Sequence, residues 1–137
     1  MVATDITGQL AQYMAEARQR RLPPEVAQAG KHRILDSLGA IVSGSRLKAG
    51  ELAIRYVRLQ GGVPEASVLA SDVKTSAVNA ALANGMFAHA DETDDFEPLT
   101  KAHPGCSVVP AALAMAERER VTGPDGGDLA CCGRCRQ

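Results

Sequence analysis

Apolar residues recur at intervals of three and four along most of this chain, and this spacing restricts the possible folds more than any other feature. Such spacing places apolar side chains along one face of an α-helix. Only two Phe, two Tyr and no Trp are present, so the core must come from Ala, Leu, Val, Ile and Met, as in closely packed helices. We therefore predict an all-α fold with short connections. Its five helical segments lie at about residues 5–21, 24–44, 48–60, 75–90 and after Gly105.

Proline and glycine mark the limits and crossings of these segments. Pro24 suits the first turn of the second helix, and Gly44 lies near its end. Gly85 allows another helix or a ligand to approach the fourth helix closely. Pro110 fits the last helix only near its first turn, because proline has no amide hydrogen to donate. The short apolar stretch 66–70 is either a strand or merely extended.

The overall charge excludes one class of partner. Fifteen basic and sixteen acidic residues give a net charge of −1, and there are few aromatic side chains on which bases could stack. We therefore expect no binding to nucleic acid. No apolar run has the length of a membrane span, and the amino terminus lacks the basic and apolar regions of a secretory signal. The sequence predicts a soluble, cytoplasmic protein that does not bind membranes.

A dense run of carboxylates is the feature that points to chemistry. Crowded like charges disfavour the ionised forms and are expected to raise at least one carboxyl pKa toward neutrality. The alternative is that the run is simply a solvated face. It lies between two apolar helical patterns and is flanked by His89 and His103, and it consists of Asp91, Glu92, Asp94, Asp95 and Glu97.

The flanking residues are candidates for binding a substrate. His89 continues the apolar face of the fourth helix, where a histidine serves either packing or chemistry. His103-Pro104-Gly105 directly precedes a helix, whose first amides are expected to be unpaired and so available to a substrate carboxylate. The alternative is an ordinary turn. We take His89 and Gly105 as candidate substrate-binding residues.

Metal and cofactor sites receive little support from the sequence. Carboxylates with an imidazole suit several divalent ions, so ligation by Asp91, Asp94, Asp95 and a histidine stays an alternative, although the loop does not match an EF-hand. Cys132-Gly-Arg-Cys135 has the spacing of half a zinc site without a second half. Phosphate-loop, dinucleotide, zincin and hydrolase motifs are absent. We assign no metal and no cofactor.

Several segments together resemble the amino-terminal signature of the MmgE/PrpD family. The resemblance spans about residues 5–129, and the ordered combination is more specific than any single motif. It is carried by Arg33-Ile-Leu-Asp-Ser-Leu-Gly-Ala40, Ala80-Ala-Leu-Ala-Asn-Gly-Met-Phe-Ala-His-Ala90, the acidic run that follows, His103-Pro-Gly105 and Val109-Pro-Ala-Ala-Leu-Ala-Met-Ala-Glu117.

The resemblance implies a lyase, a dehydratase or decarboxylase that acts on a small di- or tricarboxylate such as 2-methylcitrate. Family members share a large helical domain and a smaller α/β lid, usually as homodimers and without an iron–sulfur cluster. Their chemistry moves a proton at a carbon next to a carboxylate and stabilises the charge that develops there. A non-catalytic helical fragment or protein-interaction module is the alternative.

The resemblance also implies roles for particular residues. The acidic catalytic position of the family falls on Glu92, the paired aspartates on Asp94 and Asp95, and the imidazole on His103. The resemblance implies that Glu92 and His103 exchange protons at the reacting carbon, while Asp94 and Asp95 orient them. Phe96 departs from the pattern, because relatives often place Thr or Ser there.

The length and the end of the chain suggest a fragment. Family members are roughly three to four times longer, so residues 1–129 correspond to the amino-terminal portion of the helical domain and the lid is missing. Residues 130–137 form a Cys-rich tail in which the helical spacing stops. We expect this tail to reflect a shifted reading frame or a premature end.

Overall fold

The structure, a computed structural model, describes residues 5–17 and 20–121. Within these ranges it contains five helices and one two-stranded sheet, which confirms the all-α class. The expectations for the Cys-rich tail at 130–137 lie outside the described residues. The helices are α1 (Ile6–Ala17), α2 (Pro24–Gly44), α3 (Lys48–Gln60), α4 (Ala77–His89) and α5 (Gly105–Arg118).

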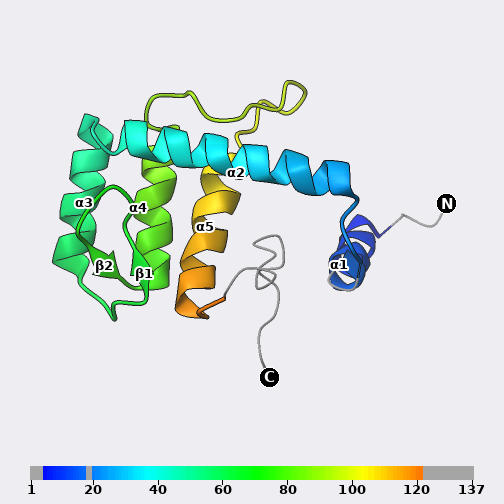
Figure 1. The fold of residues 1–137 in the computed structure, drawn as a ribbon, viewed down its shortest axis with the longest axis horizontal. Helices are drawn as coiled ribbons and strands as arrows, with labels where there is room; N and C mark the ends of the chain where they lie inside the picture. Colours follow the sequence, from blue (N-terminus) through cyan, green and yellow to red (C-terminus); the bar gives the residue numbers. More distant parts are fainter. Residues whose placement is uncertain (1–4, 18–19, 122–137) are drawn as a thin grey trace.

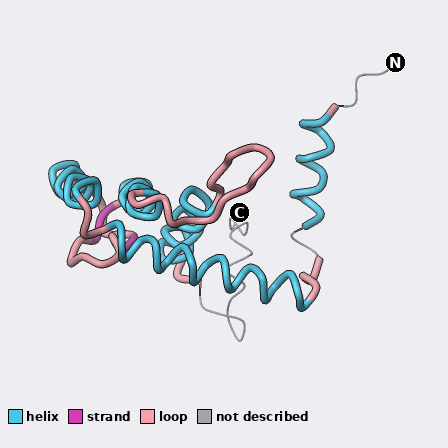
Figure 2. The backbone as a smooth tube through the Cα atoms, turned by 90° about the horizontal axis from the view of Figure 1, so that it is seen from above, coloured by secondary structure: helices cyan, strands magenta, loops and turns pink. Residues whose placement is uncertain are grey.

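Three helices stand side by side, and a fourth crosses two of them. Figure 1 shows α3, α4 and α5 next to one another, with the long α2 lying across one end of α4 and α5. Viewed from above in Figure 2, α2 runs lengthwise past the other helices, and α1 projects away from this body. The central α4 packs against α2, α3 and α5, and this packing fixes the position of its last residue, His89.

The core of the described residues is built largely from alanine, with Val, Ile and one Phe, whereas the Leu and Met that the composition also predicted there are not among its buried residues. Ala80, Ala83 and Ala88 of α4 are fully buried, and small side chains of this kind let helices approach closely. Larger side chains fill the spaces between the helices. The largest fully buried apolar ones are Phe87, Ile41, Val57 and Val68.

A small sheet joins α3 to α4. Strand β1 (Ala66–Ser67) pairs antiparallel with β2 (Lys74–Thr75). The first strand answers the question left open for residues 66–70, whereas β2 was not predicted, because two residues are too short for any alternation to show. The buried Asn84 ties the sheet to α4: its side chain accepts from the Leu69 amide at 2.8 Å and donates to the Ser67 carbonyl at 3.0 Å.

The crossing of α4 and α5 depends on Gly85 and Pro110. Pro110 is the sixth residue of α5, so the expectation that it fits only near the first turn is wrong. As proline it cannot donate to the Cys106 carbonyl four residues earlier. That carbonyl instead faces Gly85, where an added Cβ would lie 3.0 Å from the Cys106 oxygen. The close approach expected at Gly85 is confirmed.

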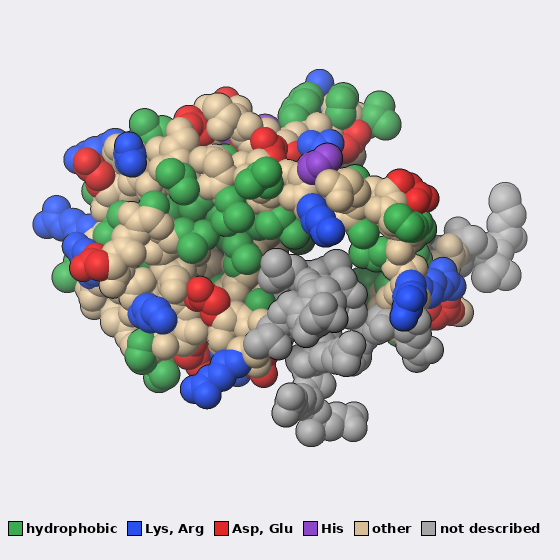
Figure 3. Space-filling model, in the orientation of Figure 1, with side chains coloured by type: hydrophobic (Ala, Val, Ile, Leu, Met, Phe, Trp, Pro, Cys, Tyr) green, Lys and Arg blue, Asp and Glu red, His purple; other side chains and the backbone are tan. Residues whose placement is uncertain are grey.

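Several apolar stripes remain exposed. None of the described residues of α1 is buried, and its Ile6, Leu10 and Tyr13 are all more than half exposed. On α4, Val78 and Leu82 are also exposed. Apolar side chains gather in the middle of the face shown in Figure 3. Among the described residues, no helix is both long enough and apolar enough to cross a membrane.

Candidate functional site

The connection from α4 to α5, residues 90–104, turns one of its five carboxylates inward. The connection is not short, contrary to expectation, and it carries an isolated bridge between Glu97 and Ala102. The Asp94 side chain has no solvent-exposed surface. Burial of a carboxylate is unfavourable unless polar partners replace water, so its neighbours define the site.

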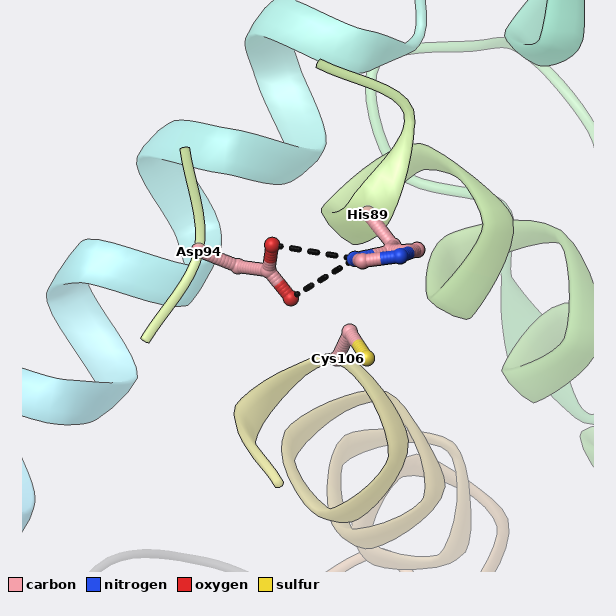
Figure 4. A group of neighbouring side chains, drawn as sticks. All are labelled: His89, Asp94 and Cys106. Carbon is pink, nitrogen blue, oxygen red and sulfur yellow. Dashed lines mark hydrogen bonds and ion pairs between the residues drawn. The ribbon is translucent and has the colours of Figure 1, made fainter. Parts of the chain in front are cut away.

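Two histidines meet the Asp94 carboxylate. His89, the last residue of α4, places Nδ1 at 3.1 Å from Oδ1 and at 3.3 Å from Oδ2 of Asp94 (Figure 4). Nδ1 of His103 lies 3.3 Å from the same Oδ1. The His103 contact lacks the geometry of a hydrogen bond, which leaves this buried nitrogen without one. We treat it as an electrostatic contact.

The two imidazoles also contact each other. Their ring centroids are 4.8 Å apart at an interplanar angle of 63°, an edge-to-face arrangement. The rings differ in exposure, since 46% of the His89 side chain and 24% of the His103 side chain reach solvent. Each histidine therefore spans from a buried carboxylate to the surface, where a small molecule can reach it.

Phe96 and Lys101 complete the surroundings of His103. The Phe96 ring centroid lies 5.4 Å from that of His103, so the residue that departs from the family pattern packs against the imidazole. Nζ of Lys101 lies 5.2 Å from the Phe96 centroid, within the range of a cation–π contact. Sequence reasoning missed both contacts, because they depend on how the loop folds back on itself.

Asp95 holds the start of α5. Its Oδ1 accepts a hydrogen bond from the Gly105 amide at 2.7 Å, and a carboxylate at this position also suits the positive end of the helix dipole. The amide that we expected to be free for a substrate carboxylate is therefore already paired. An added Cβ at Gly105 would lie 2.4 Å from Asp95 Oδ1 and 2.9 Å from Ser37 Oγ, so any larger residue here would force these two side chains to shift.

Glu92 lies apart from this cluster. It is exposed, its backbone has a φ of 54°, and its amide donates to the His89 carbonyl at 3.3 Å. No hydrogen bond or ion pair of its side chain is found within the described residues. The structure thus brings together His89, Asp94 and His103 and leaves Glu92 at the rim. Its assigned catalytic role stays a prediction.

Two outer carboxylates are held by hydroxyl and amide donors. The Ser43 hydroxyl, and after it Thr93, lowers the pKa of Asp91, whose two oxygens accept from them at 2.5 and 2.8 Å. Thr100 lowers the pKa of Glu97 through its hydroxyl and its amide. Crowding of like charges was expected to raise a pKa in this run. At these two groups the shift is the opposite, because local donors favour the charged form.

Cys106 borders the cluster and was not recognised from the sequence. Its thiol donates to the His103 carbonyl at 3.1 Å, and burial is the main reason why its pKa is raised. His89, Asp94 and Cys106 each offer one atom that could bind a metal ion, and these three atoms lie within 4.8 Å of one another. Position 106 lies seventeen residues beyond His89, so no local spacing could have indicated their proximity.

An apolar groove leads to His89. It has a volume of about 560 Å³ and runs between the outer side of α4 and the first turn of α5. This volume is within the range of small-molecule sites, which are usually concave and mostly apolar with a few polar groups. The groove is lined in part by Ala81, Leu82, Gly85, Met86, His89 and Cys106.

Comparison with known proteins identifies the family. The MmgE/PrpD N-terminal domain matches residues 8–129. A cis-aconitate decarboxylase-like protein of Aspergillus oryzae is 27% identical over 113 residues, covering 82% of this chain and 23% of that protein. The human cis-aconitate decarboxylase is 29% identical over 119 residues, covering 85% and 24%.

A third relative agrees with these two. The cis-aconitate decarboxylase of Aspergillus terreus is 24% identical over 112 residues, with 82% of this chain and 23% of that protein covered. The chain thus spans about a quarter of the length of the curated relatives that it matches. It belongs to the MmgE/PrpD family and matches the N-terminal domain of that family.

Proposed function

We propose that this chain carries part of the proton-transfer site of a lyase, a dehydratase or decarboxylase that acts on a small di- or tricarboxylate. The observation that carries the proposal is the Asp94 carboxylate, fully buried against Nδ1 of both His89 and His103. A carboxylate that orients an imidazole is a recurring feature of general acid–base catalysis. The named decarboxylase relatives support the same class of chemistry.

Asp94 sets the tautomer of its partners. A carboxylate accepts hydrogen bonds, so a neutral His89 in this contact carries its ring proton on Nδ1, and the contact with His103 favours the same form. Each Nε2 then carries a lone pair. An imidazole in this state can take a proton from the carbon next to a substrate carboxylate and return it later.

The charge on the substrate needs a cation nearby. With the Gly105 amide taken by Asp95, the α5 terminus is less available for this role. Lys101 lies on the same loop as His103, close to Phe96, and its ammonium can attract a substrate carboxylate and stabilise the charge that develops on it. Asp95 in turn acts on His103 indirectly, because it fixes the start of α5 two residues after that histidine.

Matched carboxamide variants test the assignment. Purified chain is assayed for carbon dioxide release from cis-aconitate and for dehydration of 2-methylcitrate, with circular dichroism as the check of folding. Asp94→Asn and His103→Asn should each lower turnover by about 100-fold or more, the usual scale of general acid–base catalysis. Glu92→Gln is the matched control. If it abolishes turnover while Asp94→Asn does not, the catalytic carboxylate is Glu92, as the family resemblance implied.

A non-catalytic helical module is the second candidate. The apolar stripes of α1 and α4 are exposed. This exposure favours a unit that pairs with another polypeptide or with a second copy of itself. Absence of turnover with both substrates in a folded, metal-free sample supports this candidate and contradicts the lyase proposal for the isolated chain.

A further inference from the structure

Possible metal ligands from α4, from the connection 90–104 and from α5 lie close together where α4 ends and α5 begins. His89, Asp94 and Cys106 each offer one ligand atom, and these atoms lie within 4.8 Å of one another (Figure 4). His103 adds a buried Nδ1 that has no hydrogen bond and faces Asp94. We propose that these four side chains bind one divalent transition-metal ion of the Zn²⁺ class.

The spacing of the nitrogen and oxygen atoms already suits such an ion. A tetrahedral Zn²⁺ ion lies about 2.0–2.1 Å from a nitrogen ligand and 2.0–2.2 Å from an oxygen ligand. At the tetrahedral angle, the nitrogen and the oxygen are then roughly 3.3 Å apart. Nδ1 of His89 and Nδ1 of His103 lie 3.1 and 3.3 Å from Asp94 Oδ1. These two edges of the tetrahedron therefore need almost no rearrangement.

The sulfur atom has the largest movement to make. A bond of about 2.3 Å to sulfur gives a nitrogen-to-sulfur edge of roughly 3.6 Å, against a largest separation of 4.8 Å in the group. Cys106 lies in the first turn of α5, and its thiol is held by weak contacts with the His103 carbonyl at 3.1 Å and the Ser107 hydroxyl at 3.9 Å. Metal binding therefore requires the Cys106 side chain to rotate about its Cα–Cβ bond, at the expense of these weak contacts.

The mixture of donors selects the metal. Imidazole with thiolate suits Zn²⁺ and its spectroscopic substitute Co²⁺, whereas Mg²⁺ and Ca²⁺ prefer oxygen ligands alone. Within the described residues, the ion-pair partners of the buried Asp94 carboxylate are histidines, with no Lys or Arg among them. A bound cation would satisfy this carboxylate and would displace the thiol proton of Cys106 to solvent.

Metal binding would also block the proposed proton transfer. This consequence, unlike the binding itself, rests on the proposed function. A metal ion at Nδ1 moves the ring proton to Nε2, and the lone pair that would act as a base is lost. The ion would therefore act as an inhibitor and not as a catalyst. The binding itself is independent of whether the chain turns over any substrate.

Cobalt spectroscopy tests the site, with the carboxyl-terminal cysteines removed first. The starting protein is the full chain with Cys131→Ser, Cys132→Ser and Cys135→Ser, because Cys132 and Cys135 have a metal-binding spacing of their own. This protein is treated with a chelator and titrated with Co²⁺. We expect one equivalent to bind with the visible bands of tetrahedral Co²⁺ and a thiolate-to-metal charge-transfer band in the near ultraviolet.

Two further substitutions on that background identify the ligands. Cys106→Ser should remove the charge-transfer band, and His89→Gln, at a half-exposed side chain, should weaken Co²⁺ binding by roughly tenfold or more. Zn²⁺ should displace Co²⁺ and raise the melting temperature of the starting protein more than that of the Cys106→Ser variant. The proposal is overturned if the starting protein shows no charge-transfer band, or if the band survives Cys106→Ser.

Discussion

The two sides of α4 have similar composition and opposite surroundings. On one side, Ala80, Ala83 and Phe87 are fully buried against α2, α3 and α5. On the other, Val78 is 79% exposed and Leu82 is 46% exposed, although both are as apolar as the buried set. A helix that is apolar all round is normally covered all round. The difference teaches that only one side of α4 holds this structure together, while the other leads along the groove to His89 and is free to meet a partner.

The largest expected effect is on the buried side. Phe87→Ala removes the largest fully buried apolar side chain and should lower the free energy of unfolding by about 3–5 kcal/mol. Leu82→Ala, five residues earlier on the exposed side, should cost about 1 kcal/mol or less. Urea unfolding followed by circular dichroism measures both. Equal costs would mean that the outer side of α4 is also part of the core.

The next largest effect is expected at Gly105, where the start of α5 contacts Asp95 of the site. Gly105→Ala places a methyl group against Asp95 Oδ1 and Ser37 Oγ and should cost about 1–3 kcal/mol, the usual range for overpacking. The same substitution on an Asp95→Ala background should cost clearly less, because the main clash is gone. Unfolding of the four proteins in this double-mutant cycle gives the coupling. Additive effects would contradict the contact.

The exposed side should affect association more than stability. Contiguous apolar surface beyond a few hundred Å² promotes self-association. We expect the chain to form concentration-dependent oligomers, and the pair Leu82→Ser with Met86→Ser to shift it toward monomer while leaving the melting temperature nearly unchanged. Size-exclusion chromatography with light scattering is the measurement. A clean, stable monomer with a sharp thermal transition in the parent chain would refute this prediction.

The smallest expected effect is on the connection 90–104, at Glu97. The pKa of Glu97 is lowered, first by the Thr100 hydroxyl, so its contribution to folding is present above its ordinary value near 4.5 and is lost as the pH falls through the lower folded value. Hydrogen exchange of the Leu99 and Thr100 amides, which both donate to Glu97, should accelerate in that acidic range relative to amides of α4. In Glu97→Gln this pH dependence should disappear. Its persistence would assign the effect to another group.

Helix positions were largely predictable from the sequence, and the coverage of helix faces was not. Periodic spacing and the Pro24 signal gave α2 through to Gly44 correctly. The same spacing in α1 marks an apolar stripe that no described residue buries. Periodicity shows which face of a helix is apolar, but it does not show what covers that face. Pro110 was misplaced because a local rule for proline cannot foresee that the freed carbonyl would face Gly85.

The candidate site was predictable as a region and less so in its details. The acidic run and both histidines were recognised, and the structure brings His89, Asp94 and His103 together. The sequence could not say which carboxylate turns inward, since that depends on loop backbone such as the left-handed φ at Glu92. Cys106 escaped notice because its proximity to His89 arises from the packing of α5 on α4.

The tautomers of the histidines test the central claim most directly, namely that one buried carboxylate orients two imidazoles. Long-range proton–nitrogen NMR spectra of the metal-free chain at mildly alkaline pH report which ring nitrogen carries the proton, with the exposed His32 as an internal reference. We expect the proton on Nδ1 of both His89 and His103, and loss of this preference in Asp94→Asn. Protonation of Nε2 in either histidine of the parent chain, unchanged by Asp94→Asn, would contradict the account.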